Sequence, residues 1–151
     1  MAKTLARTAD CDEIRRRIAA IAPESPRQGG SMSIGGMLCH VDDSYQCVMG
    51  ERPLSTSKLA IPQAMAKFLA LRSPFRWPRG MMTGESVRQG GGGTLPAEFV
   101  EDRARLLQTF ERFCASTQLI NVHPMLGGMN RADWLRWGYL HADHHLRQFN
   151  A

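Results

Sequence analysis

The sequence predicts an all-α protein, a four-helix bundle with a long crossover between its second and third main helices. Three observations favour this fold. Apolar residues recur at spacings of three and four in several windows, and no stretch combines two-residue alternation with β-branched enrichment. Prolines and glycines gather in one central segment, residues 51–95. A chain of 151 residues suits one domain with one core, taken here as residues 1–151.

The first main helix is expected to begin at Asp10, because Asp10 followed by Glu13 has the spacing of a capping box. It is expected to end at about Ala22, where a proline follows. Its buried stripe, at spacings of three and four residues, is predicted to be Ile14, Ile18 and Ile21.

The second main helix is predicted from its two ends. Ser33 is a suitable N-cap, and Gly50 suits a left-handed stop at the C-terminus. The apolar face between them comprises Met37, Leu38, Val41, Tyr45 and Val48. A Pro/Gly/Ser loop, residues 23–31, connects this helix to the first.

The crossover, residues 51–95, is expected to lie over the surface and to carry one short extra helix. That helix is placed at Pro62 to Leu71, because proline is favoured at a first helical position. The glycine run at residues 90–93 lacks the Lys-Ser/Thr of a phosphate loop. We interpret it as a flexible segment near the mouth of the bundle.

The third and fourth main helices follow the crossover. Pro96 is expected to open a helix that continues to about Ser116, with Phe99, Leu106, Phe110 and Phe113 facing inward. A loop over residues 117–129 comes next. Asn130 and Asp133 then mark the start of the last helix, which is expected to reach Phe149.

The composition excludes several classes of protein. Apolar residues make up 43% of the chain and charged residues 22%, which is typical of a folded protein and too apolar for disorder. No apolar run is long enough to span a membrane, and the N-terminus has no apolar core of a secretory signal, which predicts a cytoplasmic protein. The four cysteines form no CxxC motif and are expected to be free thiols.

The net charge of +5 raises the possibility of a nucleic-acid partner. The basic residues are scattered, however, and the one run, residues 15–17, follows acidic residues on the same predicted helix. No nucleic-acid module is recognisable. We therefore expect a small-molecule substrate, for which the positive excess favours an anion, and neither a nucleic-acid nor a membrane partner.

His141 and His145 lie four residues apart on the last helix and therefore share one face. Their stripe continues back through aromatic and small residues, so it is expected to point into the bundle. Buried imidazoles without partners cost about 1 to 3 kcal/mol each, and a shared metal ion would supply those partners.

His40, beside the apolar face of the second helix, is the natural third ligand. Three neutral imidazoles with an open coordination position are typical of a catalytic rather than a structural zinc site. Nickel, iron or manganese would also accept nitrogen ligands, so the cofactor is predicted only as a divalent metal ion, with zinc or nickel first. The alternative is a polar cluster in the core, held by hydrogen bonds without a metal.

Two further residues are candidates for catalysis. Asp43, three residues after His40, could orient a ligand imidazole or a bound water, or it could be an exposed charge. His144 could relay protons, although it could equally face a neighbouring helix or solvent. The HExxH motif of metalloproteases is absent, because Ala142 follows His141.

Five separated motifs, in the same order, resemble those of the DinB-like (DinB/YfiT) superfamily, and most closely an uncharacterised bacterial branch of it. They are His141-x-x-His144-His145-x-Arg147-Gln148, Met37-Leu38-Cys39-His40, and residues 73–80, 96–103 and 123–127. The resemblance implies a bundle with a long crossover, a homodimer, and a metal held by His40, His141 and His145. Some relatives are transferases or isomerases that use a small thiol.

Three hypotheses of function follow. The first is a metal-dependent enzyme that activates water or a low-molecular-weight thiol, for transfer to or hydrolysis of a small molecule. The second is a non-enzymatic protein that binds a metal or small ligand and acts through a dimer interface. The third, a basic nucleic-acid binder, has the least support, because no module of that kind is present.

Overall fold

Helices dominate the computed structural model, which describes residues 1–56, 59–78 and 84–151. The α-helices of this described part are α1 (Thr8–Ala20), α2 (Ile34–Val48), α3 (Gln63–Arg72), α4 (Phe99–Ala115) and α5 (Arg131–Leu146). Two single turns of 3-10 helix, η1 (Glu85–Val87) and η2 (Arg147–Phe149), accompany them. The predicted helical fold class is confirmed, and the short extra helix of the crossover lies within one residue of its predicted bounds.

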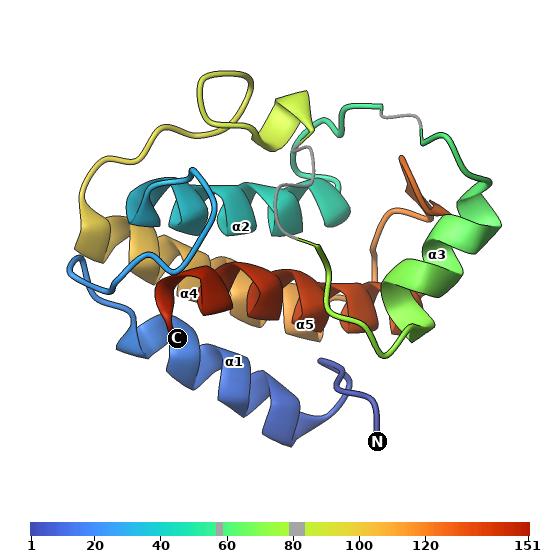
Figure 1. Cartoon of the computed structure of the whole chain (residues 1–151), viewed down its shortest axis with the longest axis horizontal. Helices are drawn as coiled ribbons and strands as arrows, with labels where there is room; N and C mark the ends of the chain where they lie inside the picture. Colours follow the sequence, from blue (N-terminus) through green and yellow to red (C-terminus); the bar gives the residue numbers. More distant parts are fainter. Residues whose placement is uncertain (57–58, 79–83) are drawn as a thin grey trace.

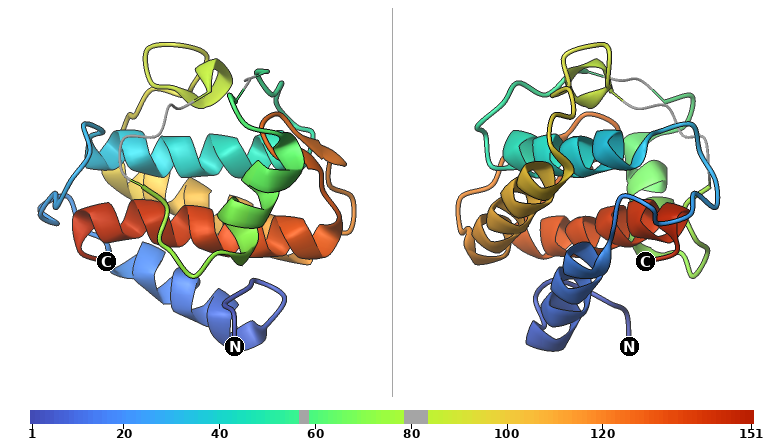
Figure 2. Two further views of the ribbon diagram at one scale, coloured as in Figure 1. Left: turned by 45° about the vertical axis from the view of Figure 1, so that its right-hand side comes forward. Right: turned by 90° about the vertical axis from the view of Figure 1, so that its left-hand side faces the viewer.

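Helix α2 lies at the centre of the molecule and packs against both α4 and α5 (Figure 1). Helix α1 packs across α4 and α5 on the other side, and α3 crosses one end of α5 (Figure 2). Twelve of the fifteen residues of α2 are buried. Any polar side chain on α2 must therefore find its partners inside the protein.

Both predicted ends of α2 are confirmed. The Ser33 hydroxyl accepts a hydrogen bond from the amide of Gly36 at 3.0 Å, as an N-cap does. Gly50 has φ of +76°, the left-handed conformation that ends many helices. The predicted apolar face, Met37 to Val48, is buried throughout. Local chemistry alone thus fixes the register of this central helix.

The predicted start of α1 is wrong. The helix begins at Thr8, and its N-cap residue, Arg7, makes no capping bond through its side chain. Asp10 lies in the first turn and accepts instead from the Thr4 amide at 2.9 Å, while Glu13 accepts from the Tyr139 hydroxyl at 2.9 Å. The capping-box pair is therefore used for tertiary contacts. The helix also ends at Ala20, two residues before the predicted end.

Helix α4 starts three residues later than predicted. Pro96 does not open it, because the carboxylate of Asp102 accepts a bond from the Ala97 amide at 2.9 Å and holds the chain extended up to Phe99. Three of the four predicted inward residues, Leu106, Phe110 and Phe113, are fully buried. Phe99 is only partly buried, at the edge of the core.

The loop before α5 contains a minimal antiparallel pair, β1 (Val122–His123) and β2 (Gly127–Gly128), which the all-α prediction did not include. Two-residue strands are too short to show alternation in a sequence. Gly127, at φ of +73°, closes the turn. Asn130 then begins α5 with a complete capping box, since its side chain and that of Asp133 each accept from the other's backbone amide, as predicted.

The crossover passes over α2 and is tied to it by hydrogen bonds (Figure 1). Both oxygens of Asp43 accept from Thr94, at 2.6 Å from its amide and 2.8 Å from its hydroxyl. Arg52 binds the carbonyl of Gly92 at 2.8 Å and Asp43 at 3.3 Å. The glycine run, predicted to be flexible, forms a turn in which Gly92 bonds back to Glu85. These contacts fix the position of η1 over α2.

One continuous hydrophobic cluster includes side chains from α1 to α5 and from η2. All three predicted residues of the α1 stripe are fully buried in it. Cys11 and Cys114 lie within it or at its edge as free thiols, with their sulfur atoms 3.5 Å apart. Within the described residues, no helix is long and apolar enough to cross a membrane.

Candidate functional site

Helices α2 and α5 bring the three predicted metal ligands together. One nitrogen from each of His40, His141 and His145 lies within 4.8 Å of the other two. The Nε2 atoms of His40 and His141 are 3.2 Å apart. Each side chain is at least 92% buried. The ring of His145 stands edge-on to both of its partners, at centroid distances of 4.6 and 4.7 Å.

The crossover determines which nitrogen of His40 carries its proton. The Nδ1 atom lies 3.0 Å from the carbonyl oxygen of Val87, in η1. A carbonyl oxygen can only accept, so Nδ1 donates and the Nε2 of neutral His40 keeps its lone pair. That lone pair points at His141. This is the arrangement in which a metal-binding histidine is oriented by a backbone carbonyl behind it.

The histidine rings are held in their neutral form. Burial lowers the pKa of His40, although the bond to Val87 opposes this effect. Burial lowers the pKa of His141 and of His145 well below the usual value, and the charges of neighbouring histidines lower both further. Neutral imidazole is the form that coordinates a metal. At neutral pH the three histidines are therefore already in the form that can bind a metal ion.

Two ring nitrogens of the site lack hydrogen-bond partners in the described part of the protein. They are the Nδ1 atoms of His141 and His145, both fully buried. The face of the His141 ring is covered by Trp137, which stacks on it at 4.6 Å with an interplanar angle of 11°. Buried polar atoms are normally paired, so the described protein by itself does not satisfy all the hydrogen-bonding groups of this histidine cluster.

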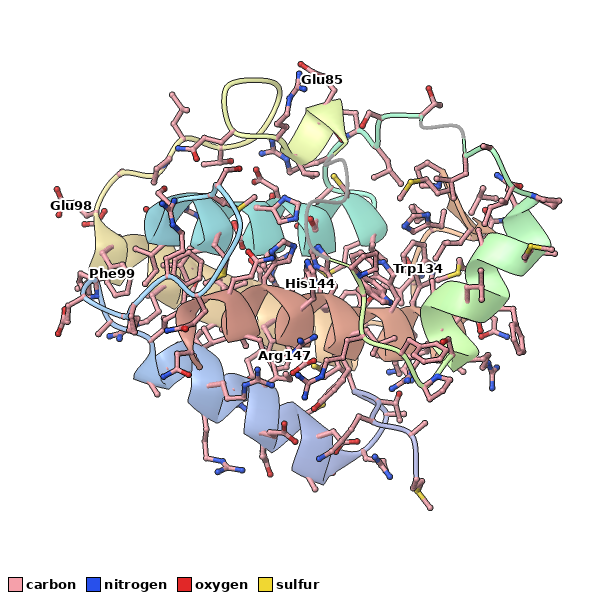
Figure 3. The ribbon with its side chains drawn as sticks, viewed as in Figure 1. Glu85, Glu98, Phe99, Trp134, His144 and Arg147 are labelled. Atoms are coloured by element: carbon pink, nitrogen blue, oxygen red, sulfur yellow. The ribbon has the colours of Figure 1, made fainter. Side chains whose placement is uncertain are left out.

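The three histidines form part of the wall of a cavity of about 500 Å³. Small-molecule sites commonly have about 300 to 1,000 Å³. The five histidines and the three tryptophans of the sequence all line this cavity. Trp134 and His144 lie between α5 and α2 in Figure 3. The metal-ligand candidates thus face a space large enough for a substrate.

The two predicted catalytic residues have different positions. His144 lines the cavity beside the three histidines, and its Nε2 lies 3.1 Å from the amide nitrogen of Gln148. Asp43 is fully buried but does not line the cavity, because its carboxylate is bonded to Thr94 and Arg52. It therefore holds the crossover, which carries Val87, and its charge also acts directly on His40 by opposing the fall in that histidine's pKa.

Sequence reasoning did not assign a role to Val87, Trp77 or His123. Trp77 comes from the crossover, and its ring lies 6.3 Å from that of His141. His123 comes from β1 and accepts from the amides of Met125 and Leu126 through Nδ1. Trp77 and His123 belong to motifs quoted above for the family resemblance, which was the one available indication. A backbone carbonyl such as that of Val87 leaves no mark in a sequence.

The buried side chain of His123 is expected to lower the free energy of unfolding in weak acid. Burial lowers the pKa of His123 to about 4, against about 6.5 in an unfolded chain. The unfolded state therefore binds more protons between these values, and stability falls as the pH falls from about 6.5 to about 4. This residue alone accounts for about 2 kcal/mol between pH 7.5 and pH 5. Urea denaturation at both pH values measures the loss.

The matched variant is His123→Asn, because an asparagine oxygen can take the two amide bonds that Nδ1 accepts and does not titrate in this range. The variant should lose about 2 kcal/mol less than the wild type between the two pH values. An equal loss in both proteins would show that His123 does not contribute to it.

Comparison with known families places the whole chain in one of them. Comparison with curated proteins and with solved structures gave no match. The family that matches carries the description "Protein of unknown function (DUF1569)", and the match covers residues 2–151. The chain therefore belongs to the DUF1569 family.

Proposed function

We propose that this chain is a metal-dependent enzyme of the DinB-like type. In this proposal, His40, His141 and His145 hold one divalent ion, zinc or nickel first and iron or manganese as alternatives. The reaction is the activation of water or a low-molecular-weight thiol, for transfer to or hydrolysis of a small molecule. The observation that carries the proposal is the convergence of three buried, neutral imidazoles on the wall of a ligand-sized cavity.

The donor set fits a metal ion. Nitrogens bound at about 2.0 to 2.1 Å to a tetrahedral ion lie roughly 3.3 Å from one another. The Nε2 atoms of His40 and His141 are already 3.2 Å apart. No carboxylate lies among the described residues that line the cavity, so a fourth ligand would have to enter from the cavity itself. Three protein ligands and one open position characterise catalytic sites.

Each neighbouring residue has a role in this proposal. The Val87 carbonyl keeps the proton of His40 on Nδ1, and Trp137 holds the plane of His141 by stacking. The cavity walls are largely apolar, and such surroundings strengthen electrostatic interactions at the site. His144 lies beside the site and can exchange a proton with a bound substrate. The ion, when bound, would supply Lewis acidity.

The same proposal covers the assembly of the protein. Helices α1, α2, α4 and α5 correspond to the four helices of a DinB-like bundle, with the crossover between α2 and α4. The protein acts as a cytoplasmic homodimer. The resemblance to the DinB-like superfamily supports these features.

Metal analysis of untagged protein tests the proposal, since a histidine tag would bind metal itself. Inductively coupled plasma mass spectrometry should find about one divalent ion per chain, before or after reconstitution. Absence of bound metal after reconstitution with zinc, nickel, iron and manganese in turn would refute it. Stoichiometric metal without turnover on broad thiol-transfer and ester panels would favour the non-enzymatic binding protein instead.

Asp43 offers a test of the crossover as a support for the site. In Asp43→Asn, one of the two carboxylate oxygens that accept from Thr94 is replaced by an NH₂ group, which cannot accept. The substitution also removes the negative charge that faces Arg52. Loosening η1 weakens the carbonyl bond to His40, so zinc affinity should fall by about 10- to 100-fold. Competition with a chromogenic chelator measures this affinity.

Asp42→Asn is the matched control. Asp42 is the neighbouring buried carboxylate of α2, but it faces Arg105 of α4 and not the crossover. Zinc affinity should stay within about threefold of the wild type, because the hydrogen bonds and ion pairs of Asp42 among the described residues go to α2 and α4 and not to η1 or Thr94. Equal losses in both variants would mean that the charge of α2, rather than the position of the crossover, governs metal binding.

A further inference from the structure

The walls of the cavity indicate the polarity of the ligand that fits it. They are built largely from apolar and aromatic side chains, among them Leu54, Leu69, Phe75, Trp77, Met125 and Trp137. Transfer of a hydrocarbon group from water into such walls contributes about 0.8 kcal/mol for each buried CH₂. A small polar metabolite would leave most of this apolar surface in contact with water. The cavity therefore suits a ligand with an extended apolar part.

The charges around the cavity have one sign. None of the described lining residues is acidic, and the one permanently charged side chain among them is that of Arg76. Arg76 also lines an adjoining, smaller pocket together with Trp77, His144, Arg147 and Gln148. Arg147 lines only the smaller pocket and is paired with Asp143 at 2.9 Å, so Arg76 is the guanidinium that faces the cavity. Arginine is well suited to bind a carboxylate or phosphate through paired hydrogen bonds.

The sequence of the crossover extends this asymmetry beyond the cavity. Residues 52–84 include six lysines and arginines and no aspartate or glutamate. Over the whole chain the ratio is 19 to 14. Asp43 and Asp133, from other segments, pair with three of its described basic residues, whereas Arg76 has no ion pair among the described residues and is free to attract an anion. The charge pattern and the lining of both pockets therefore favour the same class of ligand.

We propose that the cavity binds an amphipathic anion. Its hydrocarbon part fills the space between Leu69 and Trp137, and its anionic group binds Arg76. This deepens the proposed function and rests on it, since it names the substrate class of the same site. The apolar part then lies against the wall formed by the three histidines, which presents the reacting bond to them.

Intrinsic fluorescence provides the measurement, because all three tryptophans line the cavity. The probes are octanoate, butyrate and octylammonium, titrated into protein in EDTA and, separately, into zinc-loaded protein. Octanoate should bind about two hundredfold more tightly than butyrate, since it buries four more CH₂ groups. It should also bind at least about tenfold more tightly than octylammonium, whose charge is repelled by Arg76.

Arg76→Gln should weaken octanoate binding in EDTA by about tenfold, because it removes a charged hydrogen-bond donor. The matched control is Arg72→Gln, on the same segment. Arg72 is 70% exposed and lines neither pocket, so its removal should leave octanoate affinity unchanged. Circular dichroism of both variants shows that the fold is retained.

The outcomes separate this inference from the metal proposal. Octanoate binding in EDTA that depends on Arg76 but not on Arg72 supports the inference, whatever the metal content. Equal affinity for octylammonium, or equal effects of the two arginine variants, overturns it. Binding of octanoate to the zinc form alone, without an effect of Arg76→Gln, also overturns it, since the ion itself would then be the anion site. One metal per chain without any octanoate binding overturns the inference and leaves the proposed function standing.

Discussion

The variant His141→Gln is expected to bind zinc at least about a hundredfold more weakly than the wild type. Outer-shell partners of metal ligands typically contribute 10- to 100-fold in affinity, and a direct ligand should exceed that. Glutamine keeps a polar side chain of similar length beside Trp137, so the fold should survive. Chelator competition gives the affinity.

Thermal unfolding gives an independent reading of the same variant. A ligand that binds the folded state alone adds about 4 kcal/mol of stability at a thousand times its dissociation constant. Zinc should therefore raise the melting temperature of the wild type clearly and that of His141→Gln hardly at all. This readout requires no knowledge of the substrate.

His144→Gln is the matched control for this variant. His144 is on the same helix, is equally buried and lines the same cavity, but it does not belong to the group of three converging nitrogens. Its loss should leave zinc affinity within about threefold of the wild type. If the two variants lost affinity equally, the metal would be held by the histidine-rich wall in general and not by the three proposed ligands.

The second large effect is expected at Gly138, one turn before His141 on α5. A methyl group there would lie 2.5 Å from Cε1 of Phe113 and 2.9 Å from Leu5. Phe113 is fully buried and stacks on Tyr45 at 4.5 Å, so its ring has no free space. Overpacking of this kind costs about 1 to 3 kcal/mol.

Helix propensity acts in the opposite direction, because alanine is better than glycine by about 1 kcal/mol inside a helix. The steric cost should prevail, and Gly138→Ala should lower the free energy of unfolding by about 1 to 2 kcal/mol. Urea denaturation measures it. In a Phe113→Leu background, which removes the clashing ring atoms, Gly138→Ala should cost less than it does in the wild type, although the contact with Leu5 remains. A stabilised single variant would show that the ring moves aside at little cost.

Much of the helical framework could be predicted from local chemistry. Ser33 and Gly50 set the ends of α2, and Asn130 with Asp133 set the start of α5, because caps act within a few residues. The apolar spacing of α1 and α4 identified most of their buried faces. The same approach failed at Asp10, whose carboxylate bonds to the Thr4 amide, outside the helix. The sequence offers no means of ranking these competing partners.

The candidate site divides in the same way. Spacing placed His141 and His145 on one face of a helix, and the sequence alone singled out His40 as their partner. Their convergence within 4.8 Å depends on how α2 packs on α5, which no local pattern specifies. The roles of Asp43 and Val87 became visible only where the crossover meets α2.

The sequence by itself thus determined the helical class, both ends of α2, the start of α5, and the three residues of the candidate site, whereas α5 ends at Leu146 and a 3-10 turn continues to the predicted end at Phe149. The tertiary structure alone decided the proton position on His40, the cavity, and the place of Trp77, His123 and Arg76 in its wall. The physical reason is the distance along the chain over which each interaction acts. Caps and helix periodicity involve neighbours in the chain, whereas a cavity wall assembles residues from α2, the crossover, the β1–β2 loop and α5 through packing.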